Sequence, residues 1–189
     1  MTKRKDVQHL FRTPPIAWKR LGPYLLIFII VPIVTFVIGR QLDKQLNLPR
    51  FPPFPLNLLF GFTVFFGGLT LGIKSTQQLY SLGGGLPWGE LDSKAQSVTL
   101  VTSGVYAFSR NPITLGYSAL PCGMGLMFQS LSMTLFVPTL VLTIMSIWLK
   151  RREEPNLEKR FGAPYRAYQK QTPFLIPNPK TLIAYLCSR

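Results

Sequence analysis

The sequence predicts an all-α, polytopic membrane protein with about four transmembrane helices, a C-terminal helical hairpin and an amphipathic cytoplasmic tail. Three long runs contain no charged residue and no His: Leu21 to Gly39, Phe51 to Ile73 and Asn111 to Leu149. The first two each have roughly the 20 residues that a helix needs to cross a bilayer, and the third is long enough for two crossings joined at Gln129 and Ser130. A chain of 189 residues with this pattern predicts a single membrane domain.

The distribution of basic residues predicts how the helices are oriented. A formal net charge of +14 could by itself indicate nucleic-acid binding, but the basic residues crowd the ends of the apolar runs. With a cytoplasmic N-terminus, 18 of the 21 Lys and Arg residues lie inside, and three lie in the outer loop from Arg40 to Pro55. This asymmetry follows the positive-inside rule. We expect both termini in the cytoplasm, membrane lipids as partners and no nucleic-acid partner; the sequence carries no indication of an oligomeric state.

The N-terminal part of the chain predicts a leader and two spans. Residues 1–20 are polar and basic and would orient the chain, and the first span follows from Pro23 to Gly39. A cleaved signal peptide is not expected, because the apolar run is long and lacks a small-residue cleavage site. The second span, Leu56 to Ile73, carries Gly68 and Gly72 at the spacing that lets helices pack closely. A groove for an acyl or prenyl chain is the alternative interpretation of these glycines.

Residues 74–109 form a cytoplasmic segment that contains the turn from Gly83 to Pro87. Its three glycines are not a dinucleotide fingerprint, because no strand precedes them and no Gly-x-Gly-x-x-Gly pattern follows. A flexible lid over a cytoplasmic site and a plain loop both fit this composition.

A polar loop turns into an apolar helix between Gly104 and Gly116. Asn111 is a favoured N-cap and Pro112 a favoured first helical residue. The first-turn N–H groups and the positive end of the helix dipole then lie beside Arg110, which predicts an anion site at the membrane edge. A capped helix with one interfacial Arg is the alternative.

The third span, Pro112 to Phe128, and the fourth, Leu131 to Leu149, predict a tight hairpin. Both ends of such a hairpin lie inside, so Arg110 and the segment from Lys150 to Tyr168 share one membrane face.

That segment combines an apolar stripe with a carboxylate pair. Four residues recur at helical spacing, apart from a break near Gly162: Leu157, Phe161, Tyr165 and Tyr168. An amphipathic helix on the bilayer surface explains the stripe. Glu153 and Glu154 fit either a donor-rich ligand or pairing with the adjacent Arg residues.

Together these motifs resemble the integral membrane methyltransferases, a family that includes isoprenylcysteine carboxyl methyltransferases and small phospholipid N-methyltransferases. The resemblance covers about residues 80 to 178. The matching residues are Gly104, Tyr106, Arg110, Asn111, Pro112 and Gly116, followed after the hairpin by Glu153, Glu154, Leu157, Phe161, Gly162, Tyr165 and Tyr168. One departure is Thr114, where the family has Tyr, with Tyr117 one helical turn further on.

The resemblance implies that S-adenosylmethionine is the cofactor and that a lipophilic acceptor enters from the bilayer. It implies catalytic roles for Arg110 and Glu153. The cofactor-binding residues that it implies are Tyr106, Asn111, Pro112, Gly116, Glu154 and Tyr165, and the acceptor-binding residues are Tyr117, Phe161 and Tyr168. The cofactor carboxylate suits Arg110, and its ammonium and ribose hydroxyls suit Glu153 or Glu154. No metal site is expected, because the chain has one His.

The resemblance favours a prenylcysteine-like carboxylate as the methyl acceptor, with the amine of a phosphatidylethanolamine-type phospholipid as the alternative. A prenylcysteine-like carboxylate is already ionised at neutral pH and needs only a cation, whereas a phosphatidylethanolamine-type amine needs a base such as Glu. A non-catalytic protein that keeps the fold and binds a lipid or a partner is the alternative of another class.

The expected organisation is a basic leader at 1–20, two spans at 21–73, a methyltransferase-like core at 74–178 and a tail at 179–189.

Overall fold

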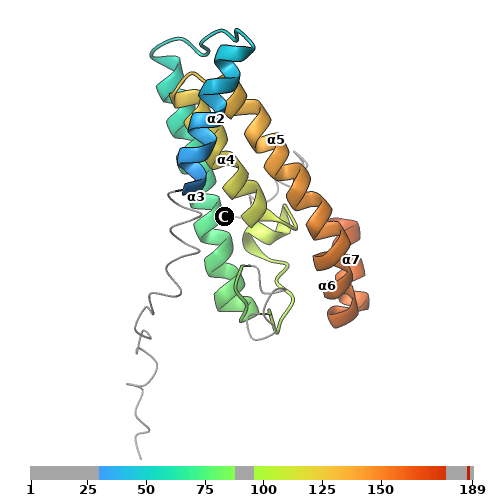
Figure 1. Ribbon diagram of the computed structural model, residues 1–189. Coiled ribbons are helices and arrows are strands. Elements are labelled where there is room, and N and C mark those ends of the chain that lie inside the picture. The colour runs from blue at the N-terminus through green and yellow to red at the C-terminus, as the bar shows by residue number, and fades with distance from the viewer. Residues whose placement is uncertain (1–29, 88–95, 178–186, 188–189) are drawn as a thin grey trace, which may run out of the picture.

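The computed structural model describes residues 30–87, 96–177 and 187, and within these ranges it contains helices and no strand (Figure 1). The helices are α2 (Val31–Gln45), α3 (Leu56–Gly83), α4 (Pro112–Met127), α5 (Leu131–Trp148), α6 (Glu154–Phe161) and α7 (Ala163–Gln171). A 3-10 turn at Gly104–Ala107 precedes α4, and a π-helical turn at Leu149–Glu153 joins α5 to α6. The predicted leader, the start of the first span and most of the tail lie outside the described residues.

The outward faces of the helices are apolar. Large hydrophobic residues are exposed along α2, α3 and α5, among them Val37, Leu59, Phe66, Leu135 and Leu140. Two continuous helices, Leu56–Gly83 and Leu131–Phe161, are long and apolar enough to cross a membrane, and only 22% of the most apolar stretch of each is buried. A core helix of a soluble protein would be mostly buried, so these faces suit contact with lipid. The count of four spans stays a prediction.

The helices α3 and α4 meet through small residues. A Cβ added at Gly116 of α4 would lie 2.7 Å from the backbone N of Gly72, and one added at Gly68 would lie 2.6 Å from the Cβ of Ala119. Such contacts leave no room for a side chain, and they are how helices approach closely where lipid supplies no hydrophobic force between them. The structure supports close packing as the reason for Gly68, whereas a Cβ at Gly72 would lie at an ordinary 3.8 Å from the Tyr117 ring.

The helix α3 continues ten residues past Ile73, where the second span was predicted to end. The polar extension beyond the predicted span is held by the segment before α4. The backbone amide of Val105 donates to the Gln78 side chain at 3.0 Å, and the Tyr106 hydroxyl donates to the Ser75 carbonyl at 3.2 Å. The apolar pattern marks the lipid-facing part of a helix, and these tertiary contacts set its length.

The helix α2 likewise runs to Gln45, six residues past the predicted end at Gly39. The side chain of Asp43 accepts a hydrogen bond from the backbone amide of Ser132 at 2.9 Å, so it satisfies a free N–H at the start of α5. Part of the predicted outer loop is therefore helical, because it is tied to a neighbouring helix.

The predicted hairpin of α4 and α5 is confirmed, with its turn at Gln129 and Ser130. Ser130 caps α5 by accepting from the amide of Met133, and the Gln129 side chain donates to the Pro52 carbonyl at 2.8 Å. The end of α3, the 3-10 turn, α6 and α7 gather at the opposite end of the bundle (Figure 1).

Candidate active site

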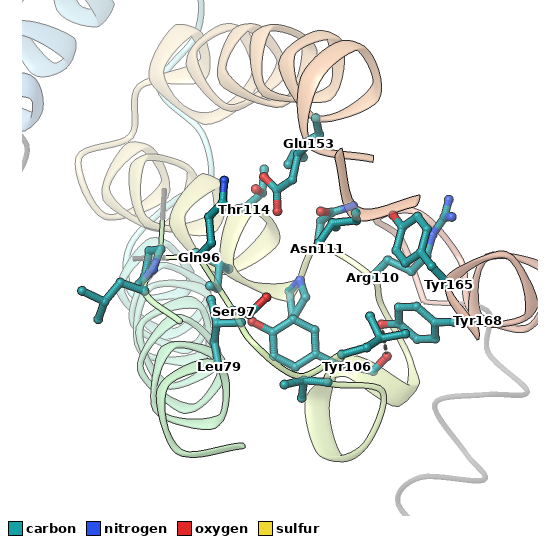
Figure 2. Close-up of a pocket in the computed structure, with 18 of the residues that line it drawn as sticks. Leu79, Gln96, Ser97, Tyr106, Arg110, Asn111, Thr114, Glu153, Tyr165 and Tyr168 are labelled. Atoms are coloured by element: carbon teal, nitrogen blue, oxygen red, sulfur yellow. Dashed lines mark hydrogen bonds between the residues drawn. The ribbon is translucent and has the colours of Figure 1, made fainter. Parts of the chain in front are cut away.

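A cavity lies where the end of α3, the segment before α4 and the helices α5 to α7 meet (Figure 2). Its empty volume is about 940 Å³, counting the space open to solvent. Apolar residues of α3 and α5, such as Leu79, Met145 and Trp148, form part of its wall. The rest of the lining includes polar residues between the helices, such as Gln96, Ser97 and Arg110, and residues of α4, α6 and α7.

Arg110 and Glu154 form an ion pair beside this cavity, with 3.1 Å between Nη1 and Oε1. Their side chains are 12% and 16% exposed, so solvent screens the pair less than it screens a surface pair. The geometry nevertheless makes no hydrogen bond: Arg110 Nε and Glu154 Oε1 are buried and have no hydrogen-bond partner within the described part of the chain. A ligand with both a carboxylate and an ammonium could satisfy the two atoms together.

Three buried tyrosines, Tyr106, Tyr165 and Tyr168, line the cavity. The Tyr165 hydroxyl lies near the Glu154 carboxylate, and the Tyr168 hydroxyl donates to the Tyr106 carbonyl at 2.7 Å. Burial raises the pKa of all three hydroxyls above the usual range, and nearby Glu charges add to this for Tyr106 and Tyr165. The tyrosines are therefore neutral hydrogen-bond donors at physiological pH.

Residues 172–175, which we call the C-terminal strap, run beside the turn that carries Arg110. The backbone amide of Arg110 donates to the Pro173 carbonyl at 2.9 Å, and the Ser109 hydroxyl donates to the Leu175 carbonyl at 2.7 Å. The strap therefore fixes the backbone from which the Arg110 side chain extends.

Asn111 precedes α4, and Pro112 begins it, as the sequence predicts, but the predicted side-chain cap is wrong. The Asn111 side chain makes no cap hydrogen bond and instead donates from Nδ2 to the Phe174 carbonyl at 2.9 Å. The Asn111 carboxamide is therefore bonded to the distant Phe174 carbonyl and not to a backbone amide in the first turn of α4.

Glu153 lines the cavity from the π-helical turn that follows α5, and Figure 2 shows its side chain extending toward Thr114 and Asn111. Thr114 occupies the position at which the family pattern has Tyr, and it also lines the cavity. A carboxylate therefore faces the cavity beside Thr114.

Seven of the eleven predicted site residues line the cavity: Tyr106, Arg110, Asn111, Pro112, Glu153, Tyr165 and Tyr168. Glu154 joins them through its ion pair with Arg110. Their individual roles stay predictions.

Three predicted site residues are not among those that line the cavity. Gly116 packs against the α3 backbone, and the ring of Tyr117 lies beside Gly72. The ring of Phe161 lies 5.1 Å from the guanidinium carbon of Arg160. Packing against α3 explains the positions of Gly116 and Tyr117, and the predicted roles of all three residues stay predictions.

Sequence reasoning missed the wall formed by Gln96, Ser97, Leu100 and Val101. The only signal in the sequence was the triple glycine: a Cβ at Gly85 would lie 2.7 Å from the backbone N of Ser97. The guanidinium of Arg160 in α6 also donates to the Ser97 carbonyl. The glycine turn at Gly83 to Pro87 thus packs against this wall and helps to hold it. The remaining residues of the predicted lid, 88–95, lie outside the described residues.

Helices with apolar outer faces, and a cavity beside a buried ion pair at one end of the bundle, are features of a membrane protein with a candidate ligand site. The chain belongs to the phospholipid methyltransferase family, whose model matches residues 56–164. The resemblance indicated by the Arg110 and Glu153–Glu154 motifs is thereby confirmed.

The chain is also similar to a protein-S-isoprenylcysteine O-methyltransferase of Schizosaccharomyces pombe, with 29% identity over 148 residues. The alignment covers 74% of this chain and 60% of the relative, so the chain spans well under the full length of that protein. No solved structure matches the chain.

Proposed function

We propose that this chain is a membrane methyltransferase that uses S-adenosylmethionine to methylate a lipophilic acceptor at the cytoplasmic membrane face. The observation that carries the proposal is the cavity beside which Arg110 Nε and Glu154 Oε1 are buried without a hydrogen-bond partner among the described residues. The amino-acid end of this cofactor has the carboxylate and the ammonium that suit those two atoms. Membership of a methyltransferase family supports the same conclusion.

In the proposed reaction the residues of this chain bind, orient and exclude water. S-adenosylmethionine supplies the methyl group on a sulfonium that loses its charge during transfer, so positioning and a dry site contribute most of the rate. Arg110 would hold the carboxylate and Glu154 the ammonium. The neutral Tyr165 hydroxyl would keep the Glu154 carboxylate in place, and the side chains of Met145 and Trp148 would exclude water from the membrane side.

A prenylcysteine-like carboxylate is the acceptor that we propose first. The similarity to the isoprenylcysteine O-methyltransferase supports it. A carboxylate is ionised at neutral pH, so it attacks the methyl group without first losing a proton. A phospholipid amine is the second candidate, because Glu153 in the cavity is a group that could accept a proton from an ammonium, and the family description names phospholipid.

Purified protein in lipid, incubated with methyl-labelled S-adenosylmethionine, a farnesylated cysteine derivative and phosphatidylethanolamine, tests these alternatives. We expect label on the cysteine derivative that is released by mild alkali, because methyl esters hydrolyse and N-methyl groups do not. Alkali-stable label on the phospholipid would favour the second candidate. Absence of both transfer and cofactor binding would contradict an enzyme and favour a non-catalytic lipid-binding or partner-binding protein.

We further propose four spans with both termini and the cavity on the cytoplasmic side, on the basis of the charge asymmetry. In a background without Cys122 and Cys187, single cysteines are introduced at Lys44, Lys94 and Lys159. An impermeant thiol reagent applied to intact cells should label the Lys44→Cys variant only. Labelling of Lys94→Cys from outside would overturn the topology, since the cofactor is made in the cytoplasm.

A further inference from the structure

The C-terminal strap lies beyond residues 56–164, to which the family model matches, yet it contacts the centre of the candidate site. Its carbonyl groups accept hydrogen bonds from the Arg110 amide and from the side chains of Ser109 and Asn111. Three successive residues of the turn before α4 are therefore held by three successive strap residues.

The Phe174 side chain of the strap reaches the Arg110 guanidinium. The guanidinium carbon lies 5.7 Å from the centroid of the Phe174 ring, within the range of a cation–π interaction. Lys150 Nζ lies 4.9 Å from the same centroid, and the Lys150 side chain is exposed. The half-buried ring thus lies close to one cation at the site and to one at the surface.

Arg110 depends on few other contacts for its orientation. Its Nε has no hydrogen-bond partner within the described residues. Its ion pair with Glu154 is as short as a hydrogen bond but lacks the directional geometry of one. An Arg side chain held in this way would lose much of its orientation if the ring were removed, because a single ion pair tolerates many rotamers.

We propose that Phe174 is a positioning residue that fixes the Arg110 guanidinium for binding the cofactor carboxylate, while the strap backbone fixes the turn beneath it. This inference rests on the proposed function. It assigns to the strap a role in cofactor affinity that packing alone would not give it, because an apolar side chain of similar size would pack as well as Phe.

The test measures cofactor binding by calorimetry and methyl transfer in lipid for Phe174→Leu and Phe174→Met, which both remove the ring and keep an apolar side chain. We expect S-adenosylmethionine to bind about 2- to 30-fold more weakly, the range that one cation–π interaction covers. The KM for the cofactor should rise by the same factor, with kcat and Tm near those of the wild type. Phe174→Tyr, which keeps the ring face, should restore affinity, and Ile176→Ala, at a strongly exposed neighbouring position, should change nothing.

A double-mutant cycle separates positioning from packing. If Phe174 acts through Arg110, then Phe174→Leu should weaken cofactor binding in the wild type but have no further effect in an Arg110→Met background. Unchanged affinity in both ring-removing variants, or effects that add fully in the double variant, would overturn the role of Phe174 and leave the proposed function standing. A wild-type protein that binds no S-adenosylmethionine would instead overturn the proposed function, and this inference with it.

Discussion

Arg110→Lys should lower the rate of methyl transfer about a hundredfold while expression, membrane insertion and Tm stay near those of the wild type. A Lys keeps the positive charge, so it can still pair with Glu154. It cannot reproduce the forked donors of the guanidinium, and it lacks the Nε donor that is buried without a partner among the described residues. The carboxylate that Arg110 is proposed to hold would therefore bind in a displaced position, and a small displacement of reacting groups is costly in rate.

The measurement is methyl transfer by the purified variant in lipid, beside its thermal unfolding. Arg166→Lys is the matched control, because Arg166 pairs with Glu158 at 3.2 Å but both side chains are exposed, at 59% and 42%. Exposed pairs contribute little, so this control should behave as wild type. Activity of Arg110→Lys within a few-fold of wild type would return Arg110 to the role of an interfacial Arg that contacts lipid headgroups.

Glu154→Gln should weaken the binding of S-adenosylmethionine about ten- to a hundredfold. Gln keeps the size of the side chain and an oxygen that can accept from Tyr165, but it loses the charge that would hold the cofactor ammonium. Hydrogen bonds to charged groups contribute about 1.5–3 kcal/mol, which is the basis of the expected range. The substitution also frees Arg110 from its ion pair with Glu154, which should strengthen the binding of the cofactor carboxylate. Because the Arg110–Glu154 contact is not a hydrogen bond, we expect this gain to be smaller than the loss of affinity at the cofactor ammonium.

Calorimetry on the Glu154→Gln protein checks this expectation, with Tm measured in parallel because the substitution leaves the Arg110 charge without its partner. Glu158→Gln removes the same charge from the exposed pair and serves as the control. An unchanged affinity for the cofactor would show that Glu154 only pairs with Arg110.

The sequence also left two partners for Glu154 open, a ligand and the adjacent Arg residues. The structure pairs it with Arg110, 44 positions away in the chain, while Arg151 and Arg152 are exposed. Neighbours along a helix point in different directions, so their charges do not identify the partner. The position of Glu154 beside the start of α4 follows from the packing of the α4–α5 hairpin.

The sequence by itself determined the features that depend on local chemistry. Pro112 begins α4 and the turn at Gln129 and Ser130 separates α4 from α5, because a fixed φ angle, a capping hydroxyl and the length of an uncharged run act over a few residues. The Arg110 and Glu153–Glu154 motifs likewise identified the family.

Only the tertiary structure decided how these local features meet. It extended α3 by ten residues through its contacts with Val105 and Tyr106, and it directed the Asn111 carboxamide to Phe174 instead of to the first turn of α4. Such contacts join residues about 30 to 60 positions apart, and they depend on how each helix is rotated against its neighbours. A pattern in one sequence specifies which face of a helix is apolar, but not which distant polar atom satisfies a given donor once the helices have packed.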